Sequence, residues 1–267
     1  MILFSKTGEK MTSLGIIPAR YAASRFEGKV LANIGNKPMI QHVWERAKKA
    51  HSLDDLIIAA DDDRIIKAVE AFGGKALFTS KSHPSGTDRL REIANPLDVD
   101  IVVNIQADEP LLNHSMIDSL VDTLRNDQDI VMASLMKEID NVEDISNPNL
   151  VKVVVDKNDF ALYFSRSPIP FIRDSEYILN EQSGCVASDN KYIFHKHIGL
   201  YAYTKDFLFT FANLPPSSLE KYEKLEQLRA LENGYRIKMV ETKYDTIGVD
   251  TPEDLARARE MLCKICD

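Results

Sequence analysis

The sequence has only three cysteines, Cys185, Cys263 and Cys266. An odd number of cysteines without a recognisable signal peptide argues against a disulfide framework and predicts free thiols in a reducing, cytoplasmic setting. Cys263 and Cys266 lie one helical turn apart, but no second Cys or His pair has a matching spacing. We therefore interpret them as small apolar residues and expect no metal there.

Long apolar runs and an excess of positive charge are also missing. No segment approaches the length of a transmembrane helix, so a membrane protein is not expected. The formal net charge of -8 argues against general binding to nucleic acid or to a membrane surface. Apolar residues make up 44% of the 267 residues, which is enough for the core of one large α/β domain or two small ones.

The glycine fingerprints of two nucleotide-binding loops are absent. Neither GxxxxGK[ST] nor GxGxxG occurs, which disfavours a phosphate-loop enzyme and a Rossmann oxidoreductase. The first apolar run, 15–19, instead leads into a loop that contains Arg20, Arg25, Gly28 and Lys29. Gly28 would let the backbone approach a phosphate, and the cations would offset the charge of a triphosphate. A solvated basic loop is the alternative interpretation of the same residues.

Short apolar strands alternate with amphipathic helices in the first half of the chain. The strands are expected at GIIPA, LIIAADDD, KALFTS and DIVVNIQ, and the helices at 38–50, 62–72 and 86–94. This alternation predicts an α/β fold whose parallel sheet is covered on both faces. Ligands of such sheets bind at the carboxyl ends of the strands, where PAR, ADDD and QADEP fall.

The second half has a different pattern. VKVVVD, FALYFSRS and HIGLYAYT predict longer, more antiparallel strands, and the polar stretch 171–194 predicts a mobile excursion. A helix is expected at 217–233, strands at RIKMVET and TIGVD, and a last helix from Pro252. We expect 1–13 to be a loose extension, in which Met11 is an alternative start. Residues 14–267 would then form one domain with an antiparallel part, about 150–210, inserted in it.

Two acids follow expected strands and are candidates for a metal site. Asp108 comes directly after DIVVNIQ, and Asp250 ends TIGVD. Magnesium prefers one or two carboxylates together with phosphate oxygens. Two carboxylates that converge would also resist joint ionisation without a cation between them. The alternative for each acid is a favourable charge at the start of the helix that follows.

Three further groups of residues have both a functional and a structural interpretation. SGTDR at 85–89 would offer backbone and hydroxyl donors to a ligand, or would simply cap a helix. His197 and Tyr201 share one side of a strand, where a lone histidine is more often structural. Glu226 and Gln227 fall in the middle of the expected helix 217–233, where an exposed position is the default.

Several motifs follow one another in a fixed order along nearly the whole chain. They are IIPAR, SRFEGK, KPMIQHVWERA, SGTDRL, VVNIQADEPLL, NPNLVKVV, ALYFSRSPIPF, HIGLYAY, KYEKLEQLRALENG and GVDTPEDL. In this combination the sequence closely resembles the 3-deoxy-manno-octulosonate cytidylyltransferase family, the CMP-Kdo synthetases. SRSPIP, HIGLYAY and LEQLR together are not expected in the related CMP-sialic acid synthetases.

The resemblance implies a mostly parallel, Rossmann-like sheet of the nucleotide-diphospho-sugar transferase type, with a smaller antiparallel region that forms a homodimer. It implies transfer of CMP from CTP to the anomeric 2-hydroxyl of Kdo, for lipopolysaccharide synthesis, with Mg²⁺ as cofactor. The residues implied to contact CTP are Pro18, Ala19, Arg20, Lys29, Ser85, Gly86, Arg89 and Gln106. Those implied to face the sugar acid are Gln106, Arg166, His197, Tyr201, Glu226 and Gln227. Asp108 and Asp250 would hold the metal, and these two acids would act in catalysis with Arg20 and Lys29.

Two departures from the family pattern concern the loops of the site. EGKVL stands here in place of PGKPL, so Glu27 and Val30 replace prolines, and Ala107 replaces the glycine of QGDEP. These changes put loop rigidity and affinity in question. An 8-amino-Kdo or another sialic-like acid is the alternative acceptor, and UTP the alternative nucleotide. A non-catalytic nucleotide or sugar sensor is the alternative of another class.

Overall fold

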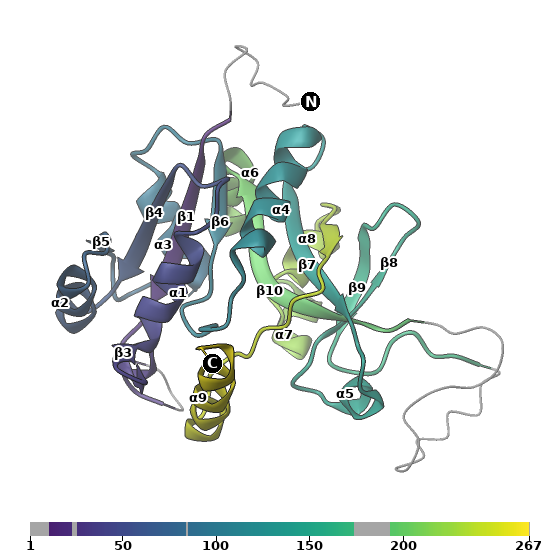
Figure 1. Cartoon of the computed structure of the whole chain (residues 1–267). Helices are drawn as coiled ribbons and strands as arrows, with labels where there is room; N and C mark the ends of the chain where they lie inside the picture. Colours follow the sequence, from purple (N-terminus) through teal and green to yellow (C-terminus); the bar gives the residue numbers. More distant parts are fainter. Residues whose placement is uncertain (1–10, 23–25, 84, 174–192, 267) are drawn as a thin grey trace.

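One nine-stranded sheet organises the chain, in a computed structural model that describes residues 11–22, 26–83, 85–173 and 193–266. Seven strands form the main path in the order β11-β7-β10-β6-β1-β4-β5 (Figure 1). Their bounds are β1 Ser13–Ala19, β4 Asp55–Ala60, β5 Ala76–Phe78, β6 Ile101–Asn104, β7 Met132–Glu138, β10 His195–Thr204 and β11 Lys238–Glu241. Two more strands, β8 Lys152–Val155 and β9 Ala161–Ser165, pair with each other beside β10.

Parallel and antiparallel strands belong to the same sheet. β1 runs parallel to β4 and β6, and β4 runs parallel to β5, as the alternating pattern predicted. The ten-residue β10 runs antiparallel to β6, β7 and β8, so it joins the β8–β9 pair to the parallel strands. The expected antiparallel strands are confirmed, but they are continuous with the core sheet. The sequence TIGVD, expected as a strand, has no strand conformation at 246–250.

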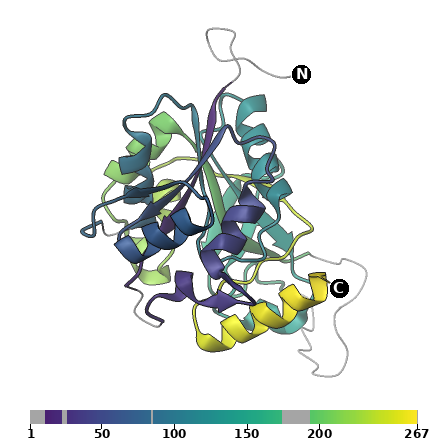
Figure 2. The same ribbon diagram turned by 60° about the vertical axis from the view of Figure 1, so that its left-hand side comes forward.

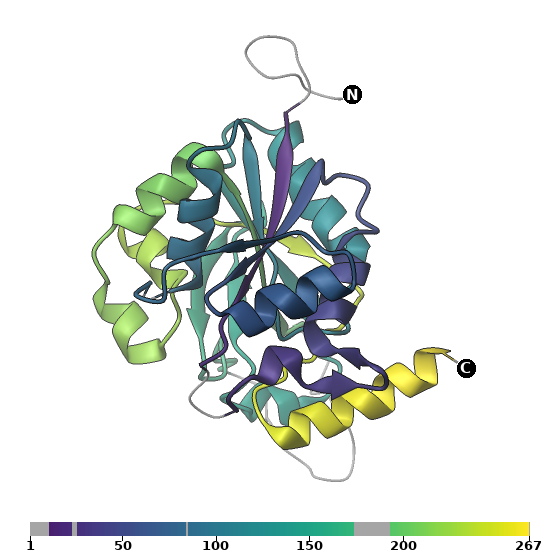
Figure 3. The same cartoon turned by 90° about the vertical axis from the view of Figure 1, so that its left-hand side faces the viewer.

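Helices cover both faces of the sheet because β1 alternates its side chains between two apolar clusters (Figure 3). Ile17 packs on one side with α1, α2 and α4, and Ile16 packs on the other with α3 and α6. Side chains cap four of these helices, which begin after Asp62, Ser85, Asn113 and Thr204. The bounds are α1 Met39–Ala47, α2 Asp63–Ala71, α3 Gly86–Ala94, α4 His114–Asn126 and α6 Lys205–Asn213.

The expected helix 217–233 is broken, and this corrects the sequence prediction. α7 spans Ser218–Glu223 and α8 spans Leu228–Glu232. Lys224 between them adopts a left-handed conformation with φ 56°, which ends α7. The break lets Leu225 and Leu228 both enter the core, so burial of apolar surface overrides a strong local helix propensity.

The last helix, α9 (Pro252–Cys266), closes the structure against the segment that follows β1. Thr251 and Asp254 form the expected reciprocal cap at its start. α9 packs on the short hairpin β2 (Asn33–Ile34) and β3 (Lys37–Pro38), as Figure 2 shows. The described structure also contains two short helices, the 3-10 helix η1 (Lys29–Leu31) and the α-helix α5 (Val142–Ser146).

The amino-terminal prediction needs one correction, because β1 begins at Ser13 and the backbone N–H of Thr12 already binds Asp100. Thr12 and Ser13 therefore belong to the folded domain and not to the expected extension. Residues 1–10, Arg25, Cys185 and most of the expected excursion 171–194 lie outside the described residues. Within the described part of the chain, no helix is both long and apolar enough to cross a membrane.

Candidate active site

A pocket of 480 Å³ opens at the carboxyl ends of β1 and β6. It brings together six of the residues expected to bind CTP or metal. Its lining consists of Pro18, Arg20, Ala22, Lys29, Val30, Gly86, Gln106, Ala107 and Asp108. Ala19 is fully buried and Ser85 caps α3, so both support the wall of the pocket without lining it. The position agrees with the rule that ligands of open α/β sheets bind at the carboxyl ends of strands.

The Lys29 ammonium lies between the two candidate metal ligands. Its Nζ donates to Asp108 Oδ2 at 2.6 Å and to Asp250 Oδ1 at 2.8 Å. It also donates to the backbone carbonyl of Val249 at 3.1 Å. The predicted convergence of the two acids is therefore confirmed, and a cation does lie between them.

Burial alone would lower the pKa of Lys29, but the negative charges of Asp108 and Asp250 and their hydrogen bonds outweigh it. The pKa of Lys29 is therefore raised above its ordinary value, and the lysine stays charged at neutral pH. A backbone hydrogen bond from the Val249 N–H to the Asp108 carbonyl, at 2.9 Å, also joins the two acidic segments. Asp250 thus reaches the site from an irregular segment.

Gly28 has the conformation that its place in the loop requires. Its φ is +66°, a region that favours glycine, and its N–H donates to the Tyr21 carbonyl at 2.8 Å. A Cβ at this position would lie 3.2 Å from the Tyr21 ring, which is closer than ordinary packing. The same ring also contacts the Arg64 guanidinium, whose carbon lies 3.3 Å from the ring centroid. Residues 21 and 28 are thereby fixed to each other.

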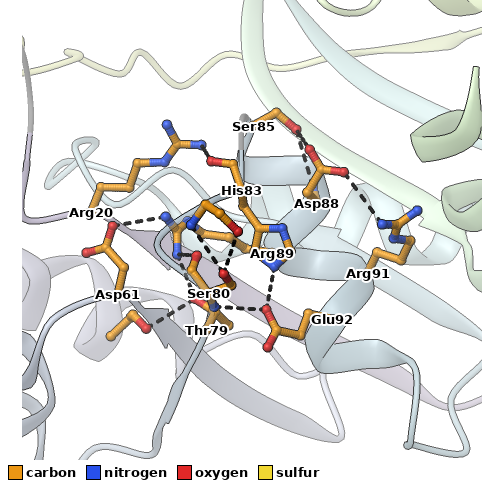
Figure 4. A network of polar contacts seen from close by, with 12 residues as sticks. Arg20, Asp61, Thr79, Ser80, His83, Ser85, Asp88, Arg89, Arg91 and Glu92 are labelled. Carbon is orange, nitrogen blue, oxygen red and sulfur yellow. Dashed lines mark hydrogen bonds and ion pairs between the residues drawn. The ribbon is translucent and has the colours of Figure 1, made fainter. Parts of the chain in front are cut away.

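Arg20 and Arg89 lie at different depths of one polar network (Figure 4). Arg20 lines the pocket and donates to the His83 carbonyl at 3.2 Å. Arg89 is 0% exposed and binds the side chains of Thr79 and Asp61, so it does not line the pocket wall. The direct contact between Arg89 and the nucleotide that the resemblance implied therefore has no surface available in this structure.

The expected sugar-binding residues of β6 and β10 do lie together. Gln106 Nε2 donates to the Gly199 carbonyl at 3.0 Å, which ties the end of β6 to β10. The His197 and Tyr201 rings have centroids 5.4 Å apart, which confirms that the two residues share one side of the strand. Burial of the ring lowers the pKa of His197 to about 3, so it is neutral at physiological pH, with Nε2 2.8 Å from Ser134 Oγ.

Glu226 and Gln227 turn inward at the break between α7 and α8. Their expected exposure was wrong, since Gln227 is buried and burial raises the pKa of Glu226. Glu226 accepts a hydrogen bond from Thr87 Oγ1 at 2.8 Å. One oxygen of Glu226 and the amide nitrogen of Gln227 are buried without a hydrogen-bond partner in the described structure, although that oxygen lies 3.5 Å from Arg229.

Arg166 is held at a distance from these residues by backbone contacts. Its Nε donates to the Glu223 carbonyl at 2.7 Å, and its Nη1 donates to the Pro148 carbonyl at 2.9 Å. The Glu223 carboxylate accepts the Arg166 N–H at 3.0 Å. The structure therefore fixes the Arg166 side chain at the ends of α7 and β9, without bringing it into the pocket described above.

Two acids near the site, Asp61 and Glu109, were noted in the sequence only as members of the strand-end motifs ADDD and QADEP. Asp61 receives both Arg89 and the Tyr21 N–H. Burial, followed by the charges of Asp108 and Asp245, raises the pKa of Glu109 to about 8. A signal for Asp61 was available, because it directly follows a run of buried residues that ends β4 at the same edge as Arg20.

The departures at positions 27 and 107 cause no backbone strain. Of the described residues other than glycine, only Asp159 and Lys224 have a positive φ. Glu27 and Ala107 therefore have ordinary backbone conformations. Ala107 is 6% exposed and packs into the core cluster below the pocket. The concern that Ala107 would restrict the loop is therefore not supported.

Comparison with known proteins gives a consistent result. The family model for cytidylyltransferases matches residues 14–239. A 3-deoxy-manno-octulosonate cytidylyltransferase of Geotalea uraniireducens is 52% identical over 254 residues, covering 95% of this chain and all of the relative. Its counterpart in Syntrophobacter fumaroxidans is 54% identical over 248 residues, covering 92% of this chain and 94% of the relative.

Solved structures agree with these relatives. A CMP:2-keto-3-deoxy-manno-octonic acid synthetase complexed with CTP has a TM-score of 0.85 and 40% identity, over 95% of this chain and 99% of that one. A putative glucose-1-phosphate thymidylyltransferase from Bacillus anthracis has a TM-score of 0.63 at 18% identity, over 94% of this chain and 95% of that one, and so shares the fold alone. With its pocket at the strand ends and its matches over nearly the full length, the chain belongs to the cytidylyltransferase family, with the 3-deoxy-manno-octulosonate cytidylyltransferases as its relatives.

Proposed function

We propose that this chain is a nucleotidyltransferase that activates Kdo, converting CTP and Kdo into CMP-Kdo and pyrophosphate. The observation that carries the proposal is the pairing of Lys29 with Asp108 and Asp250 in a pocket that also contains Arg20. Cations and carboxylates side by side at the strand ends suit a metal-bound triphosphate. The names of the Geotalea uraniireducens relative and of the synthetase solved with CTP both agree with this chemistry.

Magnesium fits the donor set at this site. Asp108 and Asp250 supply two hard oxygen ligands, and Mg²⁺ commonly combines one or two carboxylates with substrate phosphates. The described residues hold no group of three or more His, Cys, Asp or Glu side chains able to hold a metal, so phosphate oxygens and water would have to complete the coordination. When bound, the metal would neutralise charge on the phosphates and make the acceptor hydroxyl more acidic.

The protein's own residues would position the reactants and stabilise charge. Arg20 and Lys29 would bind the triphosphate, while the sugar's anomeric hydroxyl oxygen attacks the α-phosphorus in line. One P–O bond forms, the bond to the β-phosphate oxygen breaks, and the hydroxyl proton passes to the solvent as pyrophosphate leaves. No covalent enzyme intermediate is needed, so catalysis would rest on orientation and electrostatics.

The sugar acid would contact the groups around β10 and the α7–α8 break. The Glu226 oxygen and the Gln227 amide nitrogen that lack hydrogen bonds are suited to hydrogen-bond sugar hydroxyls, because buried polar groups otherwise pay a desolvation cost. On β10, neutral His197 and its neighbour Tyr201 would add uncharged hydrogen-bonding groups. Arg166 would need to release a carbonyl contact to reach a carboxylate here.

The activity can be tested by mixing the purified chain with nucleotide triphosphates, sugar acids and magnesium, and measuring pyrophosphate and product mass. We expect CTP and Kdo to give pyrophosphate and CMP-Kdo, excess EDTA to stop the reaction, and added magnesium to restore it. Faster turnover with 8-amino-Kdo, another sialic-like acid or UTP would reassign the substrate. Binding of CTP and Kdo without pyrophosphate release would favour the sensor.

We further propose that the chain acts as a homodimer in the cytoplasm. Three strongly exposed apolar side chains support a contact with a second copy through the antiparallel part and α7: Leu162 at 62%, Phe171 at 88% and Tyr222 at 85%. Sedimentation of the wild type and of Leu162→Glu would test the contact. We expect a dimer that the substitution weakens, and a wild-type monomer at micromolar concentration would contradict the proposal. The cytoplasmic location stays a prediction for cell fractionation.

A further inference from the structure

Arg89 is a fully buried cation whose contacts join three segments of the chain. From α3, its Nη1 donates to Thr79 Oγ1 at 2.7 Å and to the Ser80 carbonyl at 3.1 Å, both just after β5. Its Nη2 donates to Asp61 Oδ2 at 2.9 Å, just after β4. Figure 4 shows these contacts of Arg89. A buried guanidinium with charged and neutral acceptors on separate segments has little freedom to move.

Asp61 passes this position on to the loop after β1. While one of its carboxylate oxygens accepts from Arg89, the other accepts the backbone N–H of Tyr21 at 2.9 Å. Asp61 is 7% exposed, so both bonds lie in a region of low dielectric, where they are stronger than at the surface. The Asp61 carboxylate therefore fixes the position of the backbone at Tyr21, one residue after Arg20, where the chain leaves β1.

Tyr21 then connects to Lys29 through Gly28. The Tyr21 carbonyl accepts the Gly28 N–H at 2.8 Å, and the Tyr21 ring lies 3.2 Å from where a Gly28 side chain would begin. Lys29 follows directly and starts η1, with its ammonium 2.6 Å from Asp108. The contacts Arg89–Asp61–Tyr21–Gly28, here called the Arg89 relay, thus run from a buried side chain of α3 to the two cations that line the pocket.

We propose that Arg89 and Asp61 are positioning residues, which act through Tyr21 and Gly28 to hold Arg20 and Lys29 where the nucleotide's phosphates bind. This proposal rests on the proposed function of the pocket. It replaces a direct contact between Arg89 and the nucleotide with an indirect role. The proposal also explains why the buried position 89 holds an arginine, although an apolar side chain could fill the same volume. Only a cation there can pair with Asp61 and orient its carboxylate toward the Tyr21 N–H.

The chain offers a matched control for the cost of losing a buried arginine. Arg125 is 7% exposed and, like Arg89, binds backbone carbonyls, a hydroxyl and a carboxylate on separate segments. Its partners are Met11, Ser13, Ser52 and Asp54, at the opposite, amino-terminal end of the strands. Arg89→Met and Arg125→Met should therefore lower stability in similar ways, while only the first breaks the Arg89 relay.

Two readouts separate positioning from stability. The first is the dissociation constant of CTP with magnesium, measured by calorimetry without sugar, alongside the KM for Kdo. We expect Arg89→Met to weaken CTP binding by about tenfold or more and to leave the KM for Kdo within about twofold, since a small displacement of binding groups has large effects. Arg125→Met should lower the urea midpoint but leave CTP binding within about twofold.

The second readout is amide hydrogen exchange at Tyr21 and Gly28 in the nucleotide-free protein. Both amides should be protected in the wild type and in Arg125→Met, and should exchange faster in Arg89→Met. Asp61→Asn, which keeps the size of the side chain, should show the same faster exchange and weaker CTP binding, and it serves if Arg89→Met does not fold.

Equal losses of CTP affinity in the Arg89 and Arg125 variants, or unchanged exchange at Tyr21 in both Arg89→Met and Asp61→Asn, would overturn the relay. A wild-type protein that fails to bind CTP would instead count against the proposed function. In that case the exchange of Tyr21 and Gly28 still decides whether Arg89 and Asp61 hold the loop.

Discussion

Asp250→Asn is expected to lower turnover at least about 100-fold while leaving the fold intact, because it removes one of two carboxylates that face the Lys29 ammonium and would hold the metal. The substitution keeps the size of the side chain, and Asp250 is 56% exposed, so little packing is lost. Turnover should be measured by pyrophosphate release at saturating CTP, Kdo and magnesium, with the unfolding midpoint as a check on structure.

A matched control for this variant is Asp245→Asn. Asp245 lies in the same irregular segment, is 48% exposed and binds Lys196 at 2.8 Å, but it does not line the pocket. It should keep turnover close to that of the wild type, because its carboxylate binds Lys196 and does not line the pocket. If Asp250→Asn retains activity within a few-fold of the wild type, Asp250 does not belong to the metal site.

Lys29→Ala is expected to lower the catalytic constant by at least about tenfold, near 1.4 kcal/mol, and to raise the KM for CTP by less. The reason is that a flexible ammonium can follow the phosphates as pyrophosphate leaves, so it stabilises the transition state more than the bound substrate. The same change leaves Asp108 and Asp250 facing each other without the cation that now lies between them. Magnesium should therefore raise the unfolding midpoint of Lys29→Ala more than that of the wild type.

Lys196→Ala is the control, because Lys196 has a similar exposure of 12% against 14% for Lys29 and also binds a carboxylate. Its turnover and its response to magnesium should match the wild type. An increase in the KM for CTP alone would make Lys29 a uniform binder of the nucleotide. No change in either constant would mean that the basic loop is only a solvated surface.

The parallel part of the fold could be predicted because local pattern and tertiary environment agree there. Leu56–Ala60 is apolar throughout, and it forms a strand that is buried on both faces. The region after residue 205 shows where local pattern fails. The sequence 217–233 favours one continuous helix along its whole length. Burial of Leu225 in the core and the left-handed conformation of Lys224 divide it into two helices. Such long-range competition cannot be seen in periodicity alone.

The site was predictable where the chemistry of a residue coincides with a strand end. Asp108, Arg20 and Gln106 could be placed on these grounds, and they do line one pocket. The depth of a side chain could not be predicted in the same way. Arg89 and Asp61 were visible as polar residues at element ends, but only the packing of three segments shows that one neutralises the other below the surface. Buried polar pairs depend on contacts that no local spacing encodes.

The long strand β10 has a consequence for how the chain is made. Its residues complete the open side of β6, and the contact from Gln106 to Gly199 joins positions 93 residues apart. At about 5–20 residues per second, a ribosome needs roughly 5–20 s to travel that far, and the growing chain carries an unpaired, apolar strand edge for the whole interval. Such an edge can pair with other chains. The nascent protein is therefore most open to misassembly after the strands that line its pocket have been made and before β10 follows.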